Sequence, residues 1–219
     1  MTLFRLDASI SPATSASREL GDLVEAEWLA AHPGDTVVRR DLAADPVPAH
    51  IWPLAVSTQF LRLEDLDPAQ REAADLARTL ADELLNADAL LLDVPLYNFG
   101  VSQHVKTWFD VVYTTPELGP QGSGLAGKPA VLNTVLGGNY GPGTPREGWD
   151  HSTGWLRRVM EDVWKLDLTV IQRSFTLVGV NPALDSFADM AADLKVEAEA
   201  AAIEAGQRLA ERISEPSAV

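Results

Sequence analysis

Hydrophobic and polar positions follow two alternating patterns along the chain. Short, nearly continuous apolar runs predict β-strands, and stretches with apolar residues three or four positions apart predict helices. Strands are predicted at 3–6, 36–42, 89–95, 129–134 and 168–177. Helices are predicted from 15–17 to about 31, and at 67–86, 102–112, 155–164 and 183–213. Five strands that alternate with helices predict an α/β fold.

Local signals support several of these elements. Ser15 and Ser17 are residue types that cap helices, and Asp67 followed by Pro68 predicts the start of another helix. The apolar run 89–95 is typical of a central parallel strand that is covered on both faces. Residues 43–60 show neither period and are predicted to form a long irregular segment of the kind that often serves function.

The order of elements predicts an open, doubly wound, five-stranded parallel sheet in a three-layer α/β/α arrangement. No linker-like stretch interrupts residues 1–213, so we expect one domain, followed by a flexible tail at 214–219. Such sheets bind ligands beyond the carboxyl ends of their strands, which directs attention to the loops that follow the strands.

Charge and composition exclude several classes of function. The chain has 17 Lys and Arg against 32 Asp and Glu, a net charge of −15, which would repel nucleic acid and anionic membranes. Because it has no cysteine, disulfides, thiolate catalysis and iron–sulfur ligation are excluded. Its start lacks the features of a signal peptide, so we expect a cytoplasmic protein. The four histidines show no ligand spacing, and no metal site is predicted.

The loop after the first strand is the first candidate site. Ser9, Ser11, Thr14, Ser15 and Ser17 place hydroxyl groups beside the N-terminus of a helix. Free N–H groups and the helix dipole favour an anion there, so a phosphate could be held. The alternative is that these residues are only caps and turn formers.

The loops after the third and fourth strands are the other candidates. Tyr97-Asn98-Phe99 follows the third strand and could flank a flat ring system, although ordinary turn and core residues explain it equally well. Gly137-Gly138 follows the fourth strand and permits close backbone approach. The three loops would meet in one crevice at the switch point of the sheet. The glycines at 122–127 match the letters of a dinucleotide fingerprint, but they precede a strand and are not interpreted as one.

These motifs carry a family resemblance. They are Ser9 and Ser15-Ala16-Ser17, the segment 40–48, Pro95-Leu96-Tyr97-Asn98-Phe99 with Lys106 and Phe109-Asp110, and Gly137-Gly138. Together they resemble the flavodoxin-like, FMN-dependent NADH:azo/quinone oxidoreductases (azoreductases) of bacteria. The resemblance spans most of the chain. It implies FMN as cofactor, NADH or NADPH as co-substrate, and a homodimer that reduces quinones, azo compounds or related conjugated small molecules in a ping-pong cycle.

The resemblance also assigns roles to residues. It implies that the FMN phosphate is held by Ser9, Ser15, Ala16 and Ser17, the isoalloxazine by Leu96, Tyr97, Asn98 and Phe99, and the pyrimidine end by Gly137 and Gly138. No protein side chain is expected to act as a catalytic residue, because the hydride chemistry belongs to the flavin.

Two departures from the family pattern leave alternatives open. Val135-Leu136 stands where the family usually has polar residues, and the segment 113–119 is shorter than the usual lid. One alternative is a flavodoxin-like single-electron carrier for a protein partner. Another is a family member with weakened or lost FMN binding and a specialised non-redox role.

Overall fold

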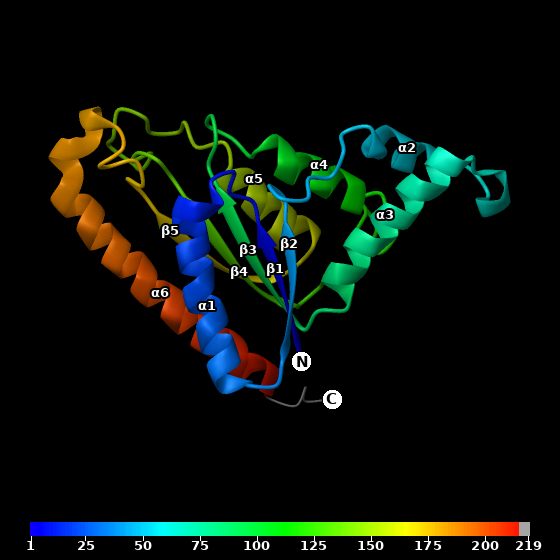
Figure 1. Cartoon of the computed structure of the whole chain (residues 1–219), viewed down its shortest axis with the longest axis horizontal. Helices are drawn as coiled ribbons and strands as arrows, with labels where there is room; N and C mark the ends of the chain where they lie inside the picture. Colours follow the sequence, from blue (N-terminus) through cyan, green and yellow to red (C-terminus); the bar gives the residue numbers. More distant parts are fainter. Residues whose placement is uncertain (215–219) are drawn as a thin grey trace.

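The computed structural model describes residues 1–214 and contains a parallel five-stranded sheet between two layers of helices (Figure 1). The strand order is β2-β1-β3-β4-β5, which confirms the predicted doubly wound arrangement of the flavodoxin-like type. Of the expected tail at 214–219, residues 215–219 lie outside the described residues. The strands are β1 Thr2–Asp7, β2 Thr36–Asp41, β3 Ala89–Pro95, β4 Pro129–Val135 and β5 Asp167–Arg173.

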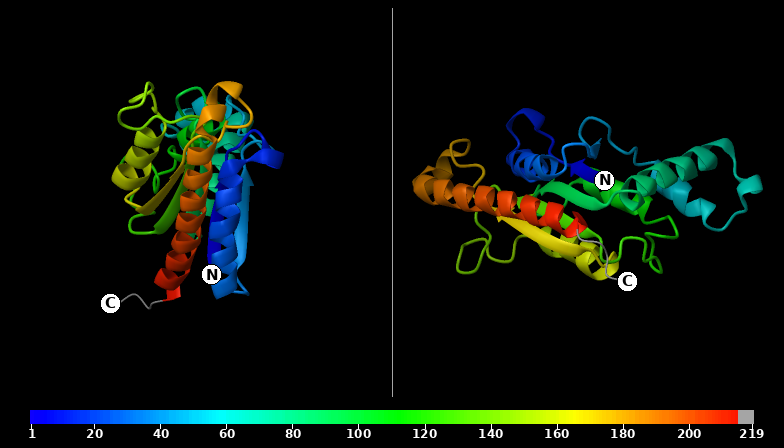
Figure 2. Two further views of the ribbon diagram at one scale, coloured as in Figure 1. Left: turned by 90° about the vertical axis from the view of Figure 1, so that its left-hand side faces the viewer. Right: turned by 90° about the horizontal axis from the view of Figure 1, so that it is seen from below.

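Helices cover both faces of the sheet. Helices α1 and α6 lie side by side on one face, as the left view of Figure 2 shows, and α3, α4 and α5 pack on the other. The helices are α1 Ala16–Ala31, α2 Ile51–Thr58, α3 Pro68–Leu85, α4 Gln103–Val112, α5 Thr153–Arg157 and α6 Ala188–Ser214. Short 3-10 helices occupy Pro12–Thr14, Leu63–Asp65 and Pro182–Phe187, and a π-helical stretch, Arg158–Val163, continues α5.

Side chains alternate across the sheet with the period of two that strands impose. On the fully buried strand β3, Leu90 and Leu92 face the layer of α3 and α4, whereas Leu91 faces α1 and α6. Arg5 on β1 and Asp93 on β3 are buried as well, and each stands two positions from a residue of the α1 side. This face of the sheet therefore carries buried charges among its apolar residues.

The helix starts predicted at 15–17 and at Asp67 are confirmed. Ser15 caps α1 by accepting a hydrogen bond from the N–H of Arg18. Asp67 caps α3 in a reciprocal capping box with Gln70, and Pro68 is the first helical residue, where its missing N–H costs nothing.

The prediction that 43–60 is irregular was wrong in part. Residues 51–58 form helix α2, which buries Ile51 and Ala55 against α3 and α4. Two helical turns are too short to produce a clear period. Pro53 also disguised the helix, although a proline is tolerated in the first turn because no hydrogen-bonded N–H is needed there.

The end of the fifth strand was also predicted wrongly, because β5 ends at Arg173 and does not reach 177. Phe175 adopts a left-handed conformation, with a φ of 59°, which turns the chain out of the sheet. The last helix likewise begins later than predicted, at Ala188, after the 3-10 turn Pro182–Phe187. Among the described helices, none is long and apolar enough to cross a membrane.

Candidate functional site

A cavity of about 340 Å³ opens at the carboxyl ends of β1, β3 and β4. One side of it is polar and the other is apolar. Although the chain carries a net charge of −15, none of the lining residues is charged. The lining residues are Ser9, Ser11, Thr14, Ser15, Ala16, Pro95, Leu96, Tyr97, Val135, Gly137, Thr176, Leu177 and Val180.

The polar side is the start of α1 together with the loop after β1. The hydroxyl groups of Ser15 and Ser17 share a hydrogen bond of 3.1 Å, and the Ser15 Oγ also accepts from the N–H of Arg18 at 3.3 Å. The N–H groups of a first helical turn have no acceptor within the helix. Hydroxyl groups and such N–H groups together suit a phosphate, because the helix dipole adds partial positive charge at this end.

Tyr97 connects the loop after β3 to the loop after β1. Its hydroxyl group lies 3.3 Å from the Ser9 Oγ and accepts a hydrogen bond from the N–H of Ile10 at 3.2 Å. The main chain of Tyr97 pairs with Gly100, with Asn98 and Phe99 between them at φ values of 48° and 69°. This left-handed turn costs free energy for residues other than glycine, so the surrounding contacts must hold it.

Phe99 projects to a partly exposed group of aromatic side chains. Its ring packs edge-on against Trp149 and Tyr140, with centroid distances of 5.5 and 6.4 Å. The carbonyl of Phe99 also accepts the N–H of His151 at 2.9 Å, which ties the segment 140–151 to the turn. The three rings form an aromatic surface beside the cavity, with Phe99 and Trp149 exposed to 39% and 49%.

The Gly137-Gly138 segment is held by the loop that joins β5 to the final helices. The N–H groups of Phe175, Thr176 and Leu177 donate to the carbonyls of Gly138, Leu136 and Gly137 at 3.1–3.2 Å. A Cβ atom added to Gly137 would lie 2.6 Å from the Leu177 Cδ1, so glycine permits this close approach. The carbonyl groups are thus satisfied by the protein.

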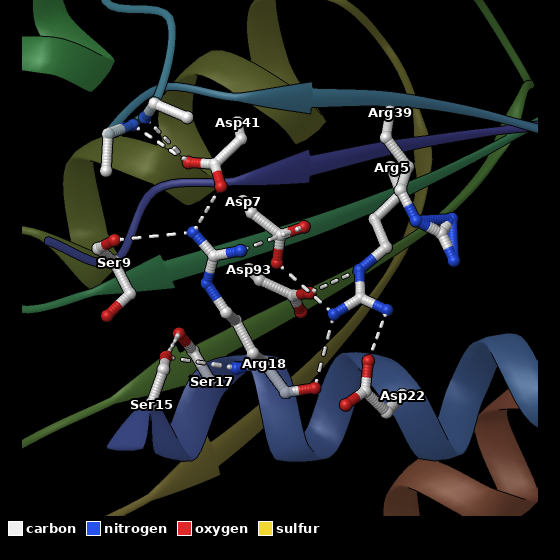
Figure 3. A network of polar contacts seen from close by, with 12 residues as sticks. Arg5, Asp7, Ser9, Ser15, Ser17, Arg18, Asp22, Arg39, Asp41 and Asp93 are labelled. Carbon is white, nitrogen blue, oxygen red and sulfur yellow. Dashed lines mark hydrogen bonds and ion pairs between the residues drawn. The ribbon is translucent and has the colours of Figure 1, made fainter. Parts of the chain in front are cut away.

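A network of charged groups lies between α1 and the sheet, next to the polar side of the cavity (Figure 3). The Arg5 guanidinium donates to Asp93 at 3.1 Å, to Asp7 at 3.2 Å, and to Asp22 and Glu25 at 2.6 and 3.0 Å. The amide group of Asn133 donates to the other oxygen of Asp93 at 2.7 Å. One cation is therefore shared among four carboxyl groups.

Burial and charge shift the pKa values of two of these carboxyl groups in opposite directions. Complete burial, together with the neighbouring Asp7, raises the pKa of Asp93 well above its ordinary value, against the opposing effect of Arg5. For Asp41, partial burial is outweighed by hydrogen bonds from Arg18 and from two backbone N–H groups, which hold its pKa below the ordinary value. The pKa of Asp93 is therefore shifted upward and that of Asp41 downward, so that Asp41 carries its charge at neutral pH.

The structure brings most of the sequence-predicted residues together. Ser9, Ser15, Ala16, Leu96, Tyr97 and Gly137 line the cavity directly. Ser17 is buried behind Ser15, and Asn98, Phe99 and Gly138 adjoin lining residues along the chain. Sequence reasoning missed the wall at Thr176, Leu177 and Val180, because part of it was read as strand. Val135 lines the cavity, whereas Leu136 is fully buried.

The strand order and a crevice built from these three loops define a flavodoxin-like protein, and the family comparison agrees. The chain belongs to the family described as having the flavodoxin-like fold, whose model matches residues 1–203.

More specific similarities are found among individual proteins. The chain is 37% identical over 203 residues to an FMN-dependent NADH:quinone oxidoreductase of Frankia casuarinae, covering 91% of this chain and 96% of the relative. It is 33% identical over 215 residues to one of Streptomyces avermitilis, covering 97% and 99%. A solved FMN-dependent NADH-azoreductase from Bacillus anthracis, in complex with FMN, has the same fold, with a TM-score of 0.76 and 18% identity over 95% of this chain and 99% of that one.

Proposed function

We propose that this protein binds FMN in the cavity and acts as an FMN-dependent NAD(P)H oxidoreductase that reduces quinones, azo compounds or related conjugated small molecules. The observation that carries the proposal is the uncharged cavity of about 340 Å³, with hydroxyl groups and a helix N-terminus on one side and apolar residues on the other. This division matches a molecule with a phosphate at one end and a flat ring system at the other. The names of the similar quinone oxidoreductases support the same function.

The cavity fits the cofactor in chemical type. Ser9, Ser15, Ala16 and Ser17 would hold the phosphate through hydroxyl and backbone N–H groups, and no carboxylate lines the cavity to repel it. Leu96, Tyr97, Asn98 and Phe99 would lie along the isoalloxazine. Gly137 and Gly138 would meet its pyrimidine end.

The protein's own groups bind, orient and shield the reactants. FMN supplies the hydride chemistry when it is bound, and no side chain is needed as a catalytic acid or base. Leu96, Val135 and Leu177 give one side of the cavity an apolar lining, against which a ring system would pack out of water. In the part of the chain that the structure describes, the N–H groups of Asn98 and Gly138 have no hydrogen-bond acceptor, and they could stabilise negative charge at the pyrimidine end.

NADH or NADPH and the acceptor would occupy the same open side of the cavity in turn, which is a ping-pong cycle. The aromatic surface of Phe99, Tyr140 and Trp149 offers flat faces for a conjugated acceptor. The acceptor is therefore expected to be a planar small molecule.

We propose that the active unit is a homodimer. Helix α2 and the segment that leads to α3 project from the sheet at the right of Figure 1 and expose large apolar side chains. Phe60 is exposed to 83%, Leu63 to 79% and Trp52 to 46%, and such a group of residues is typical of a covered interface. Light scattering of the purified protein should give twice the mass of the 23.6 kDa chain. A monomeric mass would contradict the proposal.

Two further expectations belong to the same proposal. We take residues 1–213 as one functional domain, since the elements of a single sheet and its helices build the cavity. A cytoplasmic location is consistent with the lack of cysteine and with the nicotinamide donor.

The experiment is a visible spectrum of the purified protein with added FMN, followed by NADH without oxygen and then a quinone. Binding should shift the flavin absorption, NADH should bleach it, and the quinone should restore it. Failure to bind FMN would favour the non-redox alternative. Binding without oxidation of NADH would favour an electron carrier.

A further inference from the structure

Arg18 connects α1, the loop after β1 and the end of β2 beside the polar end of the cavity, but it does not line the cavity. It belongs to the first turn of α1 and extends toward the carboxyl ends of β1 and β2 (Figure 3). Its guanidinium donates to the Asp41 carboxylate at 2.8 Å and to the Ser9 carbonyl at 3.5 Å, and it lies 3.8 Å from the Asp7 carboxylate. The side chain is thus fixed between the cavity loop and two acidic groups.

The two carboxylates depend on Arg18 to different degrees. Asp7 also receives a hydrogen bond from Arg5 at 3.2 Å. Among the described residues, Asp41 forms an ion pair with Arg18 alone, and its other donors are the N–H groups of Ala43 and Ala44. Loss of Arg18 would leave the charge of Asp41 without a cation.

Partial burial increases the effect of this charge. The side chains of Arg18 and Asp41 are exposed to only 18% and 29%, so water screens them less than it screens surface groups. The hydroxyl and N–H groups around Ser9 and Ser15 form a cradle for the phosphate. Because no lining residue of the cavity is cationic, this cradle has no positive charge of its own to offset a nearby carboxylate. A phosphate held there would feel the uncompensated Asp41.

We propose that Arg18 is a positioning residue for the cofactor phosphate, which acts by fixing the Ser9 loop and by cancelling the charge of Asp41. This inference rests on the proposed function. Arg18 would not contact the phosphate itself. Arg18 holds the Ser9 loop in place, and it cancels the negative charge of Asp41 that would otherwise repel the phosphate dianion.

Fluorescence titration with FMN and with riboflavin, which lacks the phosphate, tests the inference. For Arg18→Gln we expect the Kd for FMN to rise about tenfold, whereas the Kd for riboflavin changes less than about twofold. The double variant Arg18→Gln/Asp41→Asn should recover part of the FMN affinity, because the carboxylate charge is removed together with its cation, whereas the contact of Arg18 with the Ser9 carbonyl stays lost. Equal losses for both ligands, or no gain in the double variant, would overturn the inference.

Asp41→Asn alone provides a test that does not depend on how well Arg18→Gln folds. It keeps Arg18 and removes its counter-charge, so FMN should bind about threefold more tightly, and the gain should shrink with added salt. Weaker binding of FMN would contradict the proposal. If the wild-type protein binds neither FMN nor riboflavin, the proposed function itself fails; if it binds FMN and the variants match it, only the role of Arg18 fails.

Discussion

Replacing Gly21 by alanine should destabilise the fold, although alanine normally favours a helix. Gly21 lies in the middle of α1, directly above the buried network of Arg5 and Asp93. A Cβ atom at this position would lie 1.9 Å from the Asp93 Oδ2 and 2.8 Å from an Arg5 nitrogen. Neither group can move freely, because Asp93 is fully buried and is also held by Asn133.

The expected loss of stability is the balance of one stabilising effect and two destabilising effects. Alanine in place of glycine stabilises a helix interior by about 1 kcal/mol. Overpacking a buried site costs about 1–3 kcal/mol, and breaking a buried ion pair costs about 3–5 kcal/mol. If Asp93 is displaced only in part, the net loss for Gly21→Ala is about 2–4 kcal/mol. A loss of 3 kcal/mol would lower the melting temperature of a domain of this size by about 6–12 °C.

Urea and thermal unfolding, followed by circular dichroism, would measure this loss. Gly154→Ala is the matched control, since Gly154 also lies in a helix and nothing stands within 4 Å of an added Cβ atom. The control should be as stable as the wild type or slightly more stable. Adding Asp93→Ala to Gly21→Ala should cost less than the sum of the two single changes, because the overlap is gone. A Gly21→Ala protein that unfolds at the wild-type midpoint would contradict this prediction.

Three further predictions concern the pH dependence and the cavity. Because the folded state raises the pKa of Asp93, the contribution of Asp93 to stability is present at low pH and is lost as pH rises through that raised value. The difference in unfolding free energy between wild type and Asp93→Asn should therefore fall with rising pH. A difference that stays constant with pH would contradict this prediction. Tyr97→Phe removes the hydrogen bonds to the loop after β1 and should raise the Kd for FMN about fivefold, with Tyr113→Phe as an unaffected control. Trp149→Ala should raise the KM for a quinone and leave the Kd for FMN unchanged, because Trp149 does not line the cavity; a loss of FMN affinity would place it in the cofactor site instead.

The sheet could be predicted from sequence because its signal is local. The continuous apolar run that became β3, and the caps at Ser15 and Asp67, report directly on burial and on unpaired N–H groups. The topology then follows from the handedness of parallel crossovers. The first two candidate loops were found for the same reason, since they directly follow strong strands.

What sequence reasoning missed depends on contacts between distant segments. The wall at Thr176 and Leu177 forms because their N–H groups find acceptors at Leu136 and Gly137, some 40 positions earlier. No local pattern shows such a pairing. The role inferred for Arg18 is of the same kind, since it depends on Asp7 and Asp41, which end two different strands.

The pairing of Thr176 and Leu177 with Leu136 and Gly137 has a consequence for how the protein is synthesised. The first loop of the cavity, with Ser9 and Ser15, is synthesised more than 150 residues before the wall that closes the cavity, which comes from Thr176, Leu177 and Val180. During synthesis, which releases the N-terminal part first, the cradle at Ser9 and Ser15 exists without its opposite side. A nascent chain that ends before β5 should therefore have little affinity for the ligand, and the ligand can stabilise the fold only after the wall at Thr176 and Leu177 has been made.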